Sequence, residues 1–163
     1  MTMFSLATQL GAILQQQNKM CTTAESCTAG VLSAAITEVP ESSSWFERGF
    51  AVYSNEAKME LLGVPLSTLL EEGAVSEATA HAMALGALRR SHAHTSAAIT
   101  GIAGPEGGTL EKPVGTVCFA WALSENSVIT EKMFFKGDRV SVRNQSVLHA
   151  LSRWIFYLSD KAF

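Results

Sequence analysis

The sequence predicts an α/β protein, a three-layer α/β/α sandwich with a mixed sheet in a single domain. Two observations support this fold class. Apolar residues at helical spacing alternate with short β-prone runs, and the last two such runs lie close enough to form a hairpin. The 163 residues contain no linker-like change in composition, no repeat and no low-complexity tract, so we expect one domain over 1–163.

The first half of the chain predicts three helices and two strands. Ser54 is a suitable N-cap for the third helix, and Gly63 is suited to end it. The expected elements are, in order, a helix over 4–17, a strand over 20–24, a helix over 28–37, a strand over 46–53 and a helix over 54–63.

The second half predicts a long helix that Ser76 opens, then a buried strand, a hairpin and a last amphipathic helix. A hairpin pairs its strands antiparallel, whereas strands joined through helices favour parallel pairing, so the sheet is expected to be mixed. The expected elements are a short helical turn over 65–73, a helix over 76–88, strands over 96–100, 114–123 and 128–135, and a helix over 138–158.

Composition excludes several classes of protein. Hydrophobic residues make up 47% of the chain and charged residues 17%, which is typical of a compact globular protein. The net charge is −3, and no run of Lys and Arg exceeds two residues, so a nucleic-acid partner is not expected. The N-terminus lacks a signal peptide, and no run approaches the roughly 20 apolar residues of a membrane span, so no membrane partner is expected.

Cysteine usage indicates the compartment. The chain has three cysteines, Cys21, Cys27 and Cys118, an odd number without the spacing of metal ligands. Unpaired cysteines suit a reducing environment, so we expect a cytoplasmic protein without a metal site.

The segment from Thr22 to Gly30 carries the strongest functional signal. A β-prone run leads into small hydroxyl-bearing residues and then into a helical pattern from Val31, which predicts Ser26 at or near the first helical positions. Free backbone N–H groups and the positive end of the helix dipole stabilise an oxyanion or a phosphate there. From the residues alone, Ser26 can be an N-cap, an anion ligand or a nucleophile.

Four clusters of polar or small residues each follow a predicted strand. Ligands of open α/β sheets bind at the carboxyl ends of strands, where the loops converge. We therefore expect these clusters to lie close together: residues 25–28, 53–58, 100–108 and 137–139.

A nucleophilic Ser26 needs a base, and none of the four histidines has an evident claim to that role. Lys58 is the candidate, because it lies one turn into the helix after Tyr53 and can point back towards that loop. Burial lowers the pKa of a lysine enough for it to act as a base. The alternatives are a solvated Lys58 and a Tyr53 that packs at the edge of the core instead of relaying protons.

Two neighbouring features have similar ambiguity. Cys27 is a rival nucleophile if a helix N-terminus lowers the pKa of its thiol, or else a small buried residue. Thr100, Gly101 and Gly104 follow a buried strand, where missing side chains let backbone N–H groups approach a ligand. The alternative is a wide turn, and the loop matches neither the Walker A nor the GxGxxG pattern.

The start of the last helix offers two arginines. Arg139 and Arg143 are four residues apart, so both side chains project from the same face of the first turns. One use of this arrangement is to clamp a phosphate through bidentate hydrogen bonds. The alternative is a capping Asp138 followed by solvated arginines.

Taken together, these residues resemble the CinA C-terminal domain family, also called PncC, the nicotinamide-nucleotide amidases. The matching segments occur in order and span essentially the whole chain, and the form expected is the stand-alone domain. They are residues 22–28, 43–49, 53–58, 73–77, 100–105, 112–117 and 137–139.

The resemblance implies hydrolysis of the carboxamide of nicotinamide mononucleotide to nicotinate mononucleotide and ammonia, without a metal or cofactor. It implies a Ser–Lys site with a nearby Tyr, which falls on Ser26, Lys58 and Tyr53. It also implies a homodimer or larger homo-oligomer. The expected substrate-binding residues are Glu25, Cys27, Thr28, Ala29, Gly30, Asn55, Thr100, Gly101, Gly104, Arg139 and Arg143.

One residue departs from the family pattern. Members usually read Ser-Cys-Thr-Gly-Gly, and this chain has Ala29 at the first glycine. Alanine is harmless within a plain helix but is strained where φ must be positive. Three hypotheses follow: an active amidase, a non-catalytic paralogue that binds a nucleotide or a protein, and a hydrolase that uses Cys27 on another amide.

Overall fold

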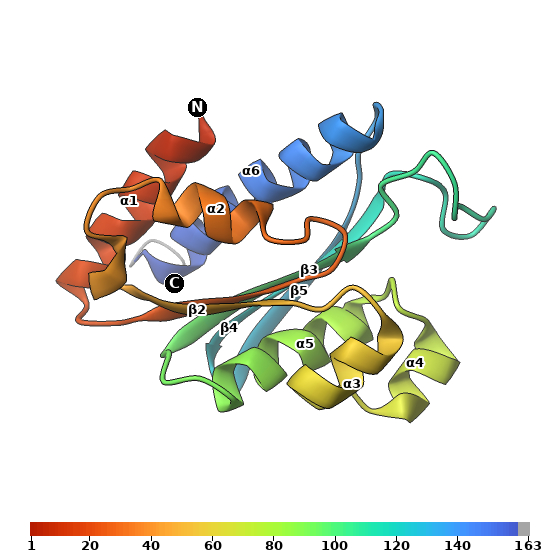
Figure 1. Ribbon diagram of the computed structural model, residues 1–163, viewed down its shortest axis with the longest axis horizontal. Helices are drawn as coiled ribbons and strands as arrows, with labels where there is room; N and C mark the ends of the chain where they lie inside the picture. The colour runs from red at the N-terminus through yellow and green to blue at the C-terminus, as the bar shows by residue number, and fades with distance from the viewer. Residues whose placement is uncertain (160–163) are drawn as a thin grey trace.

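The computed structural model of the protein describes residues 1–159 and confirms the predicted α/β architecture. Five strands form one mixed sheet in the order β2-β1-β3-β4-β5 (Figure 1). β1 pairs parallel with β2 and β3, while β4 pairs antiparallel with β3 and β5. The strands are β1 (Cys21–Glu25), β2 (Phe46–Ala51), β3 (Thr95–Gly101), β4 (Thr116–Ser124) and β5 (Ser127–Phe134).

Helices cover both faces of this sheet. Figure 1 shows α1 (Met3–Gln16), α2 (Val31–Thr37) and α6 (Arg139–Leu158) on one face. The other face carries α3 (Asn55–Leu62), α4 (Leu66–Glu72) and α5 (Glu77–Arg89). A short 3-10 turn, η1 (Ser42–Ser44), precedes β2.

Each layer has its own apolar core. Trp45, Trp121 and Trp154 are fully buried between the sheet and the α1/α6 layer. On the opposite side α5 approaches α3 closely, because a Cβ on Gly86 would lie 1.9 Å from the carbonyl oxygen of Leu62. Only glycine permits that approach.

Side-chain caps determine the residues at which α3, α5 and α6 begin. The side chain of Ser54 accepts a hydrogen bond from the N–H of Ala57, and Ser76 caps α5 in the same way. Asp138 accepts from the N–H of Ser141 at the start of α6. These bonds satisfy backbone donors that the first helical turn leaves free, so the sequence fixes these starting points locally.

The predicted start of α2 is wrong. The helix begins at Val31 instead of residue 28, so Ser26 lies in a turn after β1 and outside the first helical positions. The Glu25 carboxylate accepts hydrogen bonds from the N–H groups of Leu32 and Ser33, at 2.8 and 3.1 Å. Since this carboxylate occupies the N-terminus of α2, the anion site predicted there is already filled by the protein itself.

Within residues 1–159, no helix combines the length and the apolar character that crossing a membrane requires.

Candidate active site

The carboxyl ends of β1 and β3 open into a cavity of about 180 Å³. All four of the predicted loop clusters contribute to its wall, as expected for loops that follow strands of one sheet. Its lining residues are Ser26, Cys27, Tyr53, Asn55, Lys58, Ala74, Val75, Thr100, Gly101, Ala103 and Arg139.

Ser26 begins a tight turn at the end of β1. Its N–H donates to the carbonyl of Ile99 on β3, and its own carbonyl accepts from the N–H of Ala29. The side chain is 7% exposed and faces the cavity. The hydroxyl is therefore held at the cavity wall by main-chain bonds on both sides of Cα.

Lys58 reaches the same cavity from the first turn of α3. Its side chain is 1% exposed, and its Nζ donates a hydrogen bond to the carbonyl oxygen of Tyr53 at 3.0 Å. The prediction that this lysine points back towards the loop before α3 is confirmed. Burial lowers the pKa of the ammonium group below its ordinary value, because dehydration disfavours the charged form.

Tyr53 and Arg139 form the exposed rim of the cavity. The Tyr53 side chain is 64% exposed, so it is not a core-edge aromatic residue. Nη2 of Arg139 donates to its hydroxyl at 3.1 Å, and Nη1 donates to the carbonyl of Gly104 at 2.7 Å. Arg139 thus joins the start of α6 to two separate loops at the mouth of the cavity.

The Cys27 thiol has the wrong environment for a nucleophile. Burial raises its pKa to about 12, in spite of its own backbone and the nearby Arg143. A thiol with that pKa stays protonated at neutral pH, and the thiolate is the reactive form. The cavity therefore favours the serine over the cysteine.

Three of the predicted binding residues are engaged within the protein. Glu25 caps α2 and does not line the cavity. Arg143 donates to the carbonyls of Cys27 and Thr28 at 3.0 and 3.1 Å, so it holds the serine turn in place. Thr100 lines the cavity, but its hydroxyl donates to the carbonyl of Ala74 at 2.7 Å.

The structure adds an apolar side of the cavity that sequence reasoning missed. Ala74, Val75 and Ala103 line the cavity together with the polar groups. Ser76 could have pointed to Ala74 and Val75. It is the N-cap of α5, so the residues before it lie at the same edge of the sheet as the starts of the other helices. Apolar side chains of this kind suit a flat aromatic ring.

Ala29 and Gly30 lie in the turn between Ser26 and α2. Their φ angles are +45° and +102°, both in the left-handed region. The departure from the family pattern therefore falls on a position that favours glycine and not on plain helix. The Ala29 methyl group is exposed, so it obstructs no packed neighbour.

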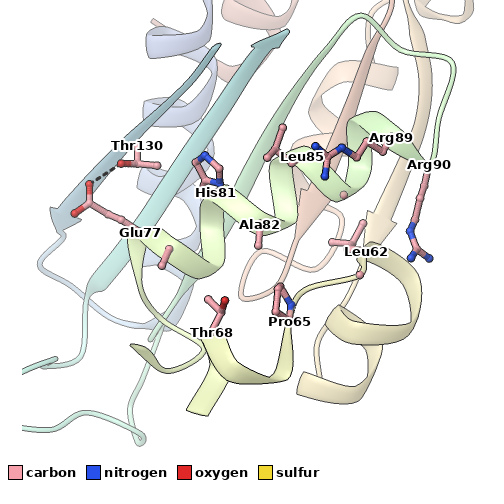
Figure 2. A pocket seen from close by; sticks show the side chains of 13 residues that line it. Leu62, Pro65, Thr68, Glu77, His81, Ala82, Leu85, Arg89, Arg90 and Thr130 are labelled. Carbon is pink, nitrogen blue, oxygen red and sulfur yellow. Dashed lines mark hydrogen bonds between the residues drawn. The ribbon is translucent and has the colours of Figure 1, made fainter. Parts of the chain in front are cut away.

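A larger cavity of about 660 Å³ runs along the outer face of α5 (Figure 2). Its only lining histidine, His81, is exposed, and neither Ser26 nor Lys58 reaches it. Ser26 and the buried Lys58 both line the smaller cavity, which is therefore the candidate site. Residues 1–159 contain no group of three or more His, Cys, Asp or Glu side chains arranged to hold a metal ion.

Comparison with known proteins identifies the family. A profile of the CinA C-terminal domain matches residues 3–157. The chain belongs to this family. The nicotinamide-nucleotide amidohydrolase PncC of Escherichia coli K12 is 48% identical over 159 residues, covering 97% of this chain and 96% of that protein. A protein of the same name from Enterobacter agglomerans is 50% identical over 146 residues, covering 90% and 89% of the two chains.

Solved structures of CinA proteins share the fold. The competence damage-inducible protein A of Klebsiella pneumoniae superposes with a TM-score of 0.94 at 35% identity, covering 98% of this chain and 99% of that one. The competence/damage inducible protein from Agrobacterium tumefaciens gives a TM-score of 0.91 at 42% identity, covering 96% and 94%.

Proposed function

We propose that the protein is a nicotinamide-nucleotide amidohydrolase that converts nicotinamide mononucleotide and water to nicotinate mononucleotide and ammonia. The relatives that bear this name are 48% and 50% identical over at least 90% of the chain. The observation that carries the proposal is the buried Lys58, whose lowered pKa provides a base at the cavity that Ser26 lines.

The first step is attack by the serine. Neutral Lys58 accepts the proton of the Ser26 hydroxyl while Oγ bonds to the carboxamide carbon, and the amide oxygen becomes an oxyanion. The carbonyl of Tyr53 holds one hydrogen of the lysine, so the nitrogen lone pair is free to face the serine. The lowered pKa of Lys58 makes its neutral form more populated than that of an ordinary lysine.

Main-chain donors of the serine turn are suited to hold the oxyanion. Within the described residues, the N–H groups of Thr28 and Gly30 bond to no protein acceptor. The glycine-rich loop after β3 is the other source of donors. One such donor contributes about 3–4 kcal/mol to stabilising a transition state of this kind.

Collapse of the tetrahedral intermediate releases ammonia. The carbon–nitrogen bond breaks as protonated Lys58 returns its proton to the leaving nitrogen, which leaves an ester on Ser26. Water then attacks that ester with Lys58 again as base, and the products are nicotinate mononucleotide and the free serine. Tyr53, whose hydroxyl accepts a hydrogen bond from Arg139 at the rim, is the proton relay in this proposal.

The size of the cavity divides the substrate into two parts. A space of about 180 Å³ suits the pyridine ring and its carboxamide, with the ribose and phosphate outside. Asn55 and the apolar residues Ala74 and Val75 also line this cavity. Arg139 at the rim is the phosphate ligand in this proposal, because the residue is exposed and its guanidinium has N–H groups beyond those that bond to Gly104 and Tyr53.

Ammonia release from nicotinamide mononucleotide tests the proposal. We expect Ser26→Ala and Lys58→Met to lose activity by at least about 1000-fold, and Cys27→Ala to keep it within about tenfold. Loss confined to Cys27→Ala would instead support a thiol nucleophile. A wild-type protein that binds the nucleotide but releases no ammonia would support the non-catalytic paralogue. Ala29, which departs from the family pattern, is the residue that favours this alternative.

We further propose that the enzyme acts in the cytoplasm as a homodimer or a larger homo-oligomer. The three cysteines are free and buried, which fits a reducing compartment.

A further inference from the structure

β5 is the last strand of the sheet, and one of its edges is free. Just beyond the ends of β4 and β5, the N–H of Phe135 donates to the carbonyl of Gly115 at 2.9 Å, which shows which residues of the ladder are hydrogen-bonded pairs. Antiparallel pairs alternate between bonded and non-bonded positions, so the odd-numbered residues of β5 bond to β4. The backbone groups directed away from β4 belong to Val128, Thr130, Lys132 and Phe134.

This free edge runs along Ser127–Phe134 and carries one exposed large apolar side chain. Phe134 is 54% exposed, and no other segment of residues 1–159 pairs with the outer side of β5. A row of unpaired N–H and C=O groups next to exposed apolar side chains is a template for pairing with another strand. The outer edge of β5 is therefore open for pairing with a strand of a second chain.

We propose that the partner is β5 of a second copy, paired antiparallel across a two-fold axis that passes through Glu131 perpendicular to the sheet. The two five-stranded sheets then join into one continuous sheet. A two-fold contact uses the same surface on both copies, so the strand must be complementary to itself. Its sequence meets that requirement in both register and charge.

In this register, residues whose backbone groups point away from β4 lie opposite one another in the two copies. An axis at Glu131 pairs Val128 with the partner's Phe134, so a branched side chain covers the exposed ring. It also pairs Thr130 with the partner's Lys132. Both pairs join residues whose N–H and C=O groups point outward, so their main-chain hydrogen bonds form without disturbing the β4–β5 ladder.

Charge complementarity supports the same register. The Thr130 hydroxyl donates to the Glu77 carboxylate of α5 at 3.0 Å, as Figure 2 shows. The partner's Lys132 lies opposite Thr130 on that face, so its ammonium group is within reach of Glu77. In residues 1–159, neither Glu77 nor Lys132 forms an ion pair within its own chain.

The side chains on the other face of the joined sheet are also compatible with this pairing. Two Glu131 carboxylates meet at the axis, and each one already accepts hydrogen bonds from His149, Arg153 and Tyr157 of its own chain. The Arg153 cations offset the repulsion between them. Next to the axis, Ile129 opposes the partner's Met133, an apolar pair.

Sedimentation velocity over a range of protein concentrations tests the pairing. We expect the wild type to be a dimer and Lys132→Pro to be a folded monomer, because proline removes an N–H that only the second copy uses. Leu70→Asp is the control, since Leu70 is 76% exposed on α4 and belongs to none of the proposed cross-strand pairs, and we expect it to remain dimeric. Circular dichroism and ammonia release verify that each variant is folded.

A charge exchange makes the test specific to the register. Lys132→Glu and Glu77→Lys each place like charges across the interface, so we expect the dimer dissociation constant to rise at least about tenfold. The double variant restores opposite charges and is expected to dissociate at a concentration near that of the wild type. A monomeric wild type, or a dimer whose dissociation constant none of these variants changes, would overturn the proposal whatever the amidase activity.

Discussion

The Nζ of Lys58 lies 3.0 Å from the carbonyl oxygen of Tyr53, and this is the hydrogen bond that the buried amine makes within residues 1–159. A single neutral acceptor does not replace the water that a charged ammonium group loses on burial. Burial therefore leaves the charge poorly compensated, which is why the pKa of Lys58 is lowered. The bond to Tyr53 positions the amine, and burial favours its neutral form, which can accept a proton.

Lys58→Met is expected to stabilise the fold at neutral pH. Between the lowered pKa of Lys58 and its ordinary value of 10.5, the unfolded chain binds a proton that the folded chain does not. The free energy of unfolding of the wild type therefore rises with pH across that window, by about 1.4 kcal/mol per unit of pKa lowering.

Urea denaturation from about pH 7 to about pH 10 measures this effect. The variant should lack the slope, so its advantage should shrink as the pH rises. A wild-type slope equal to that of Lys58→Met would show that the lysine is hydrated in the folded protein.

Ala29→Gly is expected to raise the free energy of unfolding by up to about 1 kcal/mol, because a left-handed residue with a Cβ is strained. Ala29 has a φ of +45° and an exposed methyl group, so the change removes strain without opening a cavity. Thermal unfolding measures the difference.

The matched control is Gly30→Ala. A Cβ at Gly30 would meet nothing within 4 Å, so only its φ of +102° opposes alanine. This variant should lose about 1 kcal/mol. Equal stability of both variants and the wild type would mean that the turn adopts another conformation.

Arg139 and Arg143 are expected to affect different kinetic constants. Arg139→Ala should raise KM for nicotinamide mononucleotide about tenfold or more while changing it little for nicotinamide riboside, which lacks the phosphate. Arg143→Ala should lower kcat for both substrates, because the Cys27 and Thr28 carbonyls lose the guanidinium that holds the serine turn. Equal effects of Arg139→Ala on the two substrates would contradict phosphate binding at the rim.

Glu131→Gln is expected to reduce the dependence of stability on pH in the acid range. Partial burial acts to raise the pKa of this carboxyl, but hydrogen bonds from Tyr157, Arg153 and His149 outweigh it and hold the pKa below its ordinary value. A lowered carboxyl pKa contributes stability above the pKa of the unfolded state, and that stability is lost as pH falls through the folded value.

Thermal unfolding from about pH 7 down to about pH 3 compares the two proteins. The wild type should lose more stability than the variant on acidification. Parallel curves would show that the Glu131 cluster contributes nothing to the acid sensitivity.

Elements with local signals were predictable from the sequence. Ser54 and Ser76 cap helices through bonds to residues three positions later, so the starts of α3 and α5 follow from short segments. The position of Lys58 also followed from one helical turn. In contrast, the start of α2 depends on Glu25 reaching the N–H of Leu32 seven residues ahead, a distance that no local capping pattern covers.

Residues far apart in the chain explain the remaining differences. Arg143 lies near the start of α6, as predicted. Its hydrogen-bond partners, however, are the carbonyls of Cys27 and Thr28, near the other end of the sequence. A spacing of four residues between two arginines cannot distinguish an arginine that binds a phosphate from one that holds a turn of the protein in place. The apolar wall at Ala74 and Val75 was equally hidden, since small residues before a helix carry no chemical signature.

The bonds from Arg143 to residues 27 and 28, and from Arg139 to Gly104, also decide when activity can arise during synthesis. The nucleophile turn leaves the ribosome early, while the guanidinium groups that fix it and the rim emerge about 115 residues later. A nascent or prematurely terminated chain without α6 thus carries every proposed catalytic side chain and still lacks an assembled site. We therefore expect no hydrolysis of the nucleotide before α6 has been synthesised.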